Sequence, residues 1–160
     1  MELIYRGTRD GTTSKIFHEK CDNKGPNICL YRNDKGYIFG GYSSISWTNK
    51  GGHHLAKDSF IFTLTNIHNT EPKIFENTGK DMVYHDSDYG PSFTDDICIY
   101  SDFRKKAYFP YKYKDNLGKG KSIFTGDLNN NNAYFKIKEI EVFKSLKWKI
   151  IIFNKINDYL

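Results

Sequence analysis

The alternation of apolar and polar side chains predicts a chain built mainly from short strands. Phe60, Phe62 and Leu64 alternate with Ile61 and Thr63, which is the two-residue period of a strand buried on at least one face. We therefore predict a strand over residues 59–64. Shorter β-rich runs between turn residues predict further strands at 74–75, 97–100, 106–109 and 123–124.

A hairpin is predicted earlier in the chain. Two β-rich runs, 28–31 and 37–42, are separated by Asn-Asp-Lys-Gly at 33–36, a composition typical of a turn between antiparallel strands. The adjacent Gly40 and Gly41 in the second run are typical of a bulge or of a close approach by other backbone. Where that holds, Gly40→Val or Gly41→Val is expected to destabilise the fold by on the order of 1–3 kcal/mol.

A short helix and a bent terminal strand complete the predicted elements. Residues 14–21 place Phe17 and Cys21 four positions apart, and Thr13 or Ser14 could cap the helix. Near the end of the chain, two pairs of apolar residues alternate in opposite phases, which a one-residue bulge at 138–139 would explain. These pairs are Phe135 with Ile137 and Ile140 with Val142.

These elements predict a β-rich α+β fold, with two antiparallel sheets packed as a sandwich and short helices on the flanks. The length of 160 residues suits one domain. A composition of 38% hydrophobic and 16% aromatic residues excludes a mainly disordered chain. No stretch approaches the ~20 apolar residues of a membrane span, and the first residues lack a signal-peptide pattern, so we expect a cytoplasmic protein.

The three cysteines, Cys21, Cys29 and Cys98, form no C-x-x-C motif and cannot all pair within the chain. This usage is typical of a reducing compartment, so we expect free thiols that are dispensable for folding.

Positive charge is concentrated between residues 103 and 122. The formal net charge is +5, and this segment sets seven basic residues against Asp115 alone. Interleaved aromatic residues suit stacking on bases beside phosphates, whereas lysines at a strand edge would guard against aggregation. Both interpretations stay open, and we take five of the basic residues as candidates for partner binding: Arg104, Lys105, Lys106, Lys112 and Lys114.

Sequence motifs for metals and phosphates are incomplete. His18-Glu19 begins like a zinc-binding helix, but Asp22 replaces the second histidine. The Gly-Lys-Ser at 120–122 lacks the leading glycine of a phosphate loop, because Asp115 stands there. We therefore expect neither a metal nor a nucleotide cofactor.

Three further candidates are weak. The acidic sequence at 86–90 resembles a calcium loop, but Ile97 stands where the bidentate glutamate belongs. His53 and His54, followed by Asp58, could bind a metal weakly. Cys21 and His18 could form a dyad only with a third group that orients the histidine.

Several glycine-bearing segments, taken in order, resemble the TLDc domain. They are LIYRGTRDG at 3–11, FHEKCDNKGP at 17–26, GYIFGGY at 36–42, DSFIFTL at 58–64, GPSF at 90–93 and EIEVF at 139–143. The resemblance implies a domain at 2–143 with the sandwich fold already predicted. Two departures from the family pattern are Thr94-Asp95-Asp96, where glycines are usual, and the absence of the usual helical segment before Glu2.

The positions that match the family's motifs are expected to maintain the fold. Arg9 and Asp10 could pair with each other, and Pro26 and Pro91 after glycines set turns. The full set is Arg9, Asp10, Gly11, Gly25, Pro26, Gly40, Gly41, Gly90, Pro91, Glu139 and Glu141.

The resemblance implies a non-catalytic protein-binding domain that acts in oxidative-stress protection by binding the vacuolar proton-pumping ATPase. It carries over no catalytic residue, and it implies a location peripheral to the vacuolar or lysosomal membrane through that partner. One alternative is an antioxidant enzyme that uses Cys21, His18 or Glu19. The other is a nucleic-acid or anionic-membrane binder through 103–122, with nucleic acid the less favoured partner.

An extension at 144–160 has no counterpart in the family pattern. Leu146, Trp148, Ile150 and Ile152 would share one face of a strand, and this much apolar surface in water invites aggregation. We therefore expect the extension to dock on the domain as a terminal strand or helix.

Overall fold

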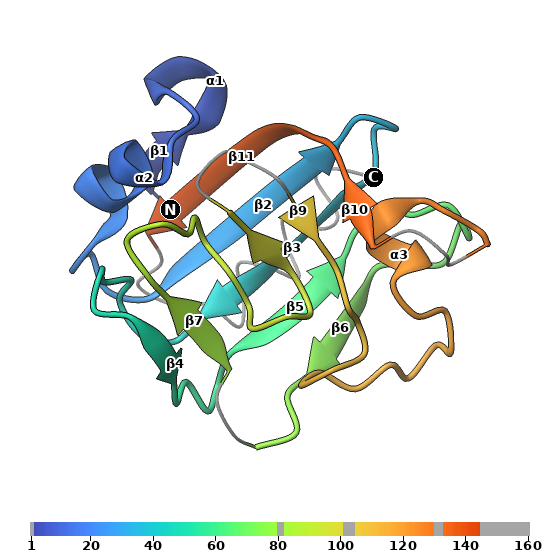
Figure 1. Ribbon diagram of the computed structural model, residues 1–160. Coiled ribbons are helices and arrows are strands. Elements are labelled where there is room, and N and C mark those ends of the chain that lie inside the picture. Colours follow the sequence, from blue (N-terminus) through green and yellow to red (C-terminus); the bar gives the residue numbers. More distant parts are fainter. Residues whose placement is uncertain (1, 80–81, 101–104, 130–132, 145–160) are drawn as a thin grey trace.

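A six-stranded antiparallel sheet organises the computed structural model, which describes residues 2–79, 82–100, 105–129 and 133–144 (Figure 1). The strand order is β1-β11-β2-β3-β5-β6, so the first and last strands in sequence pair at one edge. The strands are β1 (Glu2–Arg6), β11 (Ile137–Lys144), β2 (Asn27–Asn33), β3 (Ile38–Ser43), β5 (Phe60–Thr63) and β6 (Lys73–Glu76).

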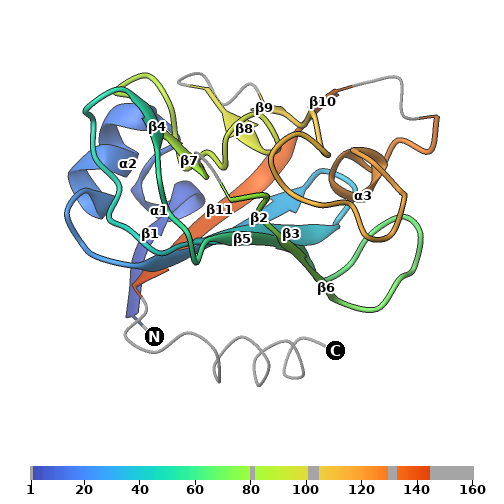
Figure 2. The ribbon, with the colours of Figure 1, turned by 90° about the horizontal axis from the view of Figure 1, so that it is seen from below.

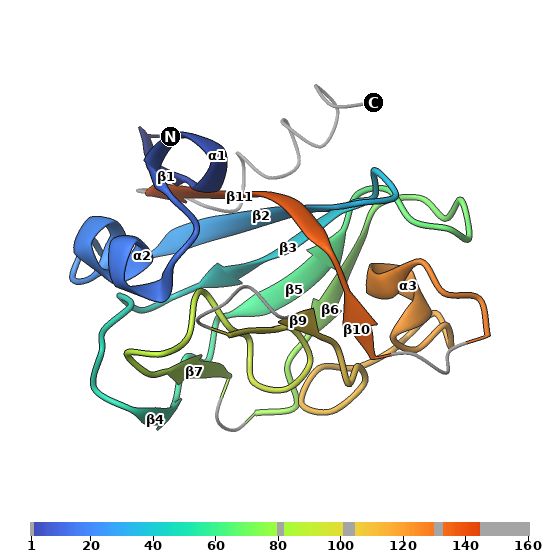
Figure 3. The ribbon, with the colours of Figure 1, turned by 45° about the horizontal axis from the view of Figure 1, so that its top comes forward.

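Two smaller sheets and three short helices accompany the main sheet. One small sheet has the order β10 (Tyr134–Phe135), β9 (Lys105–Lys106), β8 (Cys98–Ile99), and the other pairs β4 (Gly52–His54) with β7 (Val83–His85). The helices are α1 (Gly7–Asp10), α2 (Ser14–Cys21) and α3 (Ser122–Thr125). Both small sheets, α2 and α3 lie on the same side of the main sheet (Figures 2 and 3).

The fold is thus β-rich with an antiparallel main sheet and short helices, as predicted. The described residues form three sheets rather than the predicted two, because the layer over the main sheet is divided into short ribbons. The main core lies between these layers and is largely aromatic. Tyr31 and Phe39 of the sheet pack with Phe124 of α3 and Phe135 of β10, and Trp47 packs against Phe93.

Local capping and turn chemistry confirm the predicted helix and hairpin. Helix α2 has the predicted limits, and the Thr13 hydroxyl oxygen accepts the N–H of Ile16 at 3.3 Å. Strands β2 and β3 pair in antiparallel register. In the turn between them, the Asn33 side-chain oxygen accepts the backbone N–H groups of Lys35 and Tyr37 at 3.1 and 2.9 Å.

The predicted bulge in the last strand is also confirmed. The pairing of β11 with β2 shifts register between Ile137 and Glu139. The shift lets Ile137 on one side of the bulge and Ile140 on the other both face the main core.

The remaining strand predictions have mixed outcomes. Strands β5, β6 and β8 lie within or around the runs predicted for them, whereas β9 covers only the start of the predicted 106–109. The strand predicted at 123–124 is wrong, because these residues belong to helix α3. Gly126, at a φ of 66°, ends that helix in the left-handed conformation typical of a glycine cap.

The described part of the chain ends with β11 at Lys144. Residues 145–160 of the predicted extension lie outside the described residues. Within the described ranges, no helix has the length and apolar character needed to cross a membrane.

Candidate protein-binding surface

Lys106 is the centre of a group of tyrosines on the small β8-β9-β10 sheet. It lies opposite Tyr134 in the β9–β10 pairing. Its ammonium group is 4.9 Å from the centre of the Tyr134 ring, 5.6 Å from that of Tyr100 and 5.8 Å from that of Tyr108. These distances are in the range of cation–π attraction. Hydrogen bonds with Tyr134 and Tyr108 raise the pKa of Lys106, so it stays charged.

Strand alternation explains which side chains reach this surface. Successive residues of a strand point to opposite faces, so Lys106 and Tyr108 share the outer side while Lys105 and Ala107 point inward. Lys105 is accordingly only 8% exposed. By contrast, Tyr108 is 46% and Tyr134 52% exposed, which is high for such large side chains.

The aromatic surface continues beyond Lys106 toward the other small sheet. The Tyr100 ring centre lies 4.9 Å from that of Tyr89, and Tyr89 lies 4.8 Å from Tyr84 on β7. Burial raises the pKa of all three phenols, so their hydroxyl groups remain protonated. We call this set the tyrosine patch, and it consists of Tyr84, Tyr89, Tyr100, Lys106, Tyr108 and Tyr134.

A buried carboxylate fixes the loop that follows the patch. The Asp96 carboxylate has no exposed surface and accepts the backbone N–H groups of Tyr111 and Lys112, each at 2.7 Å. Thr94, at a φ of 50°, donates its hydroxyl to the same carboxylate at 3.0 Å. A threonine thus adopts a left-handed backbone conformation in this loop, where the resemblance led us to expect glycines. Burial raises the pKa of Asp96, and these hydrogen bonds oppose that change.

Two further basic candidates lie outside the β8-β9-β10 sheet. Lys112 and Lys114 flank Tyr113 in a segment whose backbone bonds to Thr78 and to Glu76 at the end of β6. The Lys112 ammonium lies 5.1 Å from the centre of the Tyr111 ring. Arg104 lies outside the described residues. Among the candidates that the structure describes, Lys106 is therefore the one whose ammonium group lies near three aromatic rings.

The family-motif positions make contacts that hold β1, α1 and β11 together. Arg9 and Asp10 form a salt bridge at 2.7 Å, and the Asp10 carboxylate also accepts the Arg6 N–H at 2.9 Å. The Arg9 guanidinium holds the pKa of Asp10 well below its ordinary value. Glu141 pairs with Arg6 at 2.6 Å, and Glu139 accepts hydrogen bonds from the backbone and hydroxyl of Thr8.

The motif glycines and prolines stand at turns or close approaches. Gly11 and Gly25 have φ values of 116° and 82°, which favour glycine, and Pro26 follows the second of them. Gly90 lies against Ile99, and the Pro91 carbonyl accepts the buried Tyr31 hydroxyl at 2.7 Å.

The thiols are buried rather than presented to solvent. Cys21, Cys29 and Cys98 are all free and buried. Burial raises the pKa of Cys98 to about 11 and raises the pKa of the other two as well. The reactive thiolate form is therefore scarce at neutral pH.

Both ring nitrogens of His18 are engaged with groups other than a thiol. Nδ1 lies 2.8 Å from Asp22 Oδ1, and Nε2 lies 2.9 Å from the Asp86 carbonyl and 3.0 Å from that of Tyr89. His18 thus ties α2 to the 86–89 turn. Glu19 also borders an open hollow of about 390 Å³ beside this helix.

The predicted histidine candidates lie on the β4–β7 ribbon. His54 stacks on the buried His85 with ring centres 4.2 Å apart, and His53 contacts Tyr84. Within the described ranges, no three histidine, cysteine or acidic side chains gather in a way that could hold a metal ion.

The fold and this surface define the class of protein: a β-rich domain that presents tyrosines and a lysine on short strands. A family model described as the TLDc domain matches residues 1–145, and the chain belongs to that family. The chain is also 41% identical over 44 residues to the MTOR-associated protein MEAK7 of Danio rerio. That stretch is 28% of this chain and 10% of the relative, so the chain matches only a small part of that protein.

Proposed function

We propose that this TLDc domain binds a protein partner through the tyrosine patch and has no catalytic role of its own. The observation that supports this most directly is the position of Lys106, within 6 Å of three tyrosine rings of which two are about half exposed. Tyrosines supply large contact areas at low entropic cost and are enriched at protein interfaces. A lysine among them favours an acidic partner surface.

Membership in the TLDc family makes the vacuolar proton-pumping ATPase the partner that we propose first. Protection against oxidative stress would then act through the pump, at the cytoplasmic side of the vacuolar or lysosomal membrane. Direct scavenging by thiols is less well supported, because the three cysteines are buried with raised pKa values. The relative from Danio rerio is named for its association with MTOR, which also favours a protein partner.

A binding measurement with purified peripheral subunits of the vacuolar ATPase tests this proposal. Lys106→Glu and Tyr108→Ala should each weaken binding at least tenfold, because the first reverses the central charge and the second removes a half-exposed ring. Lys73→Glu, an equal charge reversal at an exposed position on β6, is the matched control and should bind like the parent. Lys105 is left unchanged because it is buried.

The outcomes test the proposed site and the proposed partner separately. Equal binding by the parent and Lys106→Glu would rule out the patch, whereas a parent that fails to bind would rule out these subunits. The same proteins should be titrated with single-stranded nucleic acid at two salt concentrations. Strongly salt-dependent binding that Lys106→Glu removes would favour the nucleic-acid alternative instead.

A further inference from the structure

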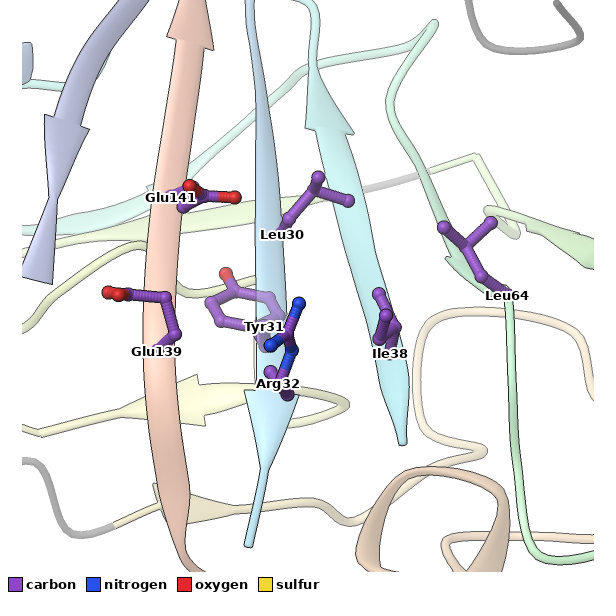
Figure 4. Close-up of a pocket in the computed structure, with 7 residues that line it drawn as sticks. All are labelled: Leu30, Tyr31, Arg32, Ile38, Leu64, Glu139 and Glu141. Carbon is purple, nitrogen blue, oxygen red and sulfur yellow. The ribbon is translucent and has the colours of Figure 1, made fainter. Parts of the chain in front are cut away.

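The main sheet carries a second apolar cluster on the face opposite the main core. Ile28 on β2 points to this face while its neighbour Cys29 belongs to the main core, and Phe62 and Ile61 on β5 divide in the same way. We call this set the outer cluster. It consists of Ile28, Tyr42, Phe60, Phe62 and Leu64, with Leu30, Ile38 and Ile74 packed against it. Figure 4 shows Leu30 on β2, Ile38 on β3 and Leu64 just after β5, beside a small hollow.

The outer cluster is more deeply buried than an open sheet face allows. Ile28, Phe62 and Leu64 are only 4%, 2% and 7% exposed. Neighbours in the same sheet cover the flanks of such side chains, but their outer ends need a further layer. Yet α2, α3 and both small sheets lie on the other side (Figure 2), and α1 packs mainly against the β1 and β11 edge. The described residues therefore do not supply that layer.

The remainder of the chain contains one segment that fits the outer cluster. Residues 145–160 follow directly from Lys144 at the end of β11, where the preceding Phe143 pairs with Ile28 on β2. In this segment, apolar residues recur at the three- and four-residue spacings of an amphipathic helix. They are Leu146, Ile150, Phe153, Ile156 and Leu160, and the opposite side of such a helix would carry Lys147, Trp148, Ile151, Lys155 and Asp158.

We propose that residues 145–160 pack on the outer cluster as an amphipathic helix and form the missing layer. A helix of this length is about 24 Å long. The path from β11 over β2 and β3 to β5 is three strand spacings, about 14 Å, so the segment reaches the whole cluster. Because it is covalently continuous with β11, this segment has a large concentration advantage over any separate partner.

Thiol labelling of the full-length chain tests this packing. Ile28→Cys places a reporter thiol in the outer cluster, while the adjacent native Cys29 faces the main core and reports unfolding. The reporter should react with N-ethylmaleimide at least tenfold more slowly than a thiol at the exposed Leu128. Ile150→Asp or Phe153→Asp should raise the reporter rate at least tenfold, while Cys29 stays unlabelled. Ile151→Asp is the matched control, because it makes the same change off the apolar stripe, and it should leave the rate within twofold.

Three results would each overturn the proposal. The first is that the Ile28→Cys thiol reacts as fast as the Leu128→Cys thiol in the parent background. The second is that Ile151→Asp accelerates labelling as much as Ile150→Asp. The third is that protection of the Ile28→Cys thiol rises with protein concentration, which would show that a second copy of the chain covers this face. If Cys29 is labelled in an Asp variant, that variant has unfolded. The test then rests on the labelling rates of the Ile28→Cys and Leu128→Cys thiols in the parent background.

Discussion

Gly40→Ala and Gly41→Ala should each lower the free energy of unfolding by on the order of 3 kcal/mol, because there is no room for even one methyl group. A Cβ at Gly40 would lie 2.0 Å from the Cys29 carbonyl oxygen on β2 and 2.9 Å from the Phe62 ring. A Cβ at Gly41 would lie 2.5 Å from the ring of the buried Phe93. The two glycines thus leave space for one aromatic ring on each face of the sheet.

Chemical denaturation of the two variants beside Gly51→Ala measures this effect. A Cβ at Gly51 would lie 3.7 Å from its nearest neighbour, an oxygen of Asp86, so alanine there should change stability by less than about 0.5 kcal/mol. Phe93→Leu should partly relieve Gly41→Ala in a double-mutant cycle, because both changes act on the same contact. Parent-like midpoints for Gly40→Ala and Gly41→Ala would show that the sheet does not pack as described.

The sequence predicted those elements whose signals are local. The limits of α2, the hairpin turn at Asn33 and the bulge before Glu139 all depend on residues within a few positions of each other. The pair at 123–124 was mistaken for a strand because two apolar residues fit either period. The nearby Gly126, which caps α3, was the signal that could have corrected this prediction.

The candidate site depends on contacts that sequence spacing does not reveal. Lys106 was a candidate from composition, but its position between Tyr100 and Tyr134 follows from the pairing of β9 with both β8 and β10. Lys105 was predicted beside it with equal weight, and the pleat of β9 turns it inward instead. The composition thus indicates the basic segment, and the strand pairing determines that Lys106 is the lysine that lies among the tyrosines.

The histidine pair is a further case in which the fold supplies a partner that sequence reasoning missed. The sequence groups His54 with His53 and Asp58, whereas the antiparallel pairing of β4 with β7 stacks it on His85. His85 is 2% exposed, and its Nδ1 lies 3.1 Å from the Thr48 hydroxyl oxygen. Among the described residues, neither His54 Nε2 nor His85 Nε2 has a hydrogen-bond partner. Burial is the main cause that lowers the pKa of His85 to about 4, and the nearby His54 and His18 contribute to the same lowering.

This lowered pKa predicts that the domain loses stability when the pH falls below 6.5. The unfolded chain protonates His85 near its ordinary pKa of 6.5, whereas the folded chain does so only near pH 4. Unfolding therefore takes up a proton between these values, and the stability present above pH 6.5 is lost as the pH falls toward 4. Between pH 7 and pH 5 the loss should be about 2 kcal/mol, roughly 5 °C in melting temperature for a domain of this size.

Melting curves at pH 7 and pH 5 for two variants isolate this contribution. His85→Phe keeps a ring against His54 and Trp47 but cannot be protonated, so the difference between the two pH values should shrink by more than half. His53→Phe, at an exposed position of the same β4 strand, should keep the parent's difference. The salt-bridged Asp10 does not interfere, because its pKa is lowered and its contribution is lost only at lower pH. A parent protein that melts at the same temperature at both pH values would contradict the burial of a neutral His85.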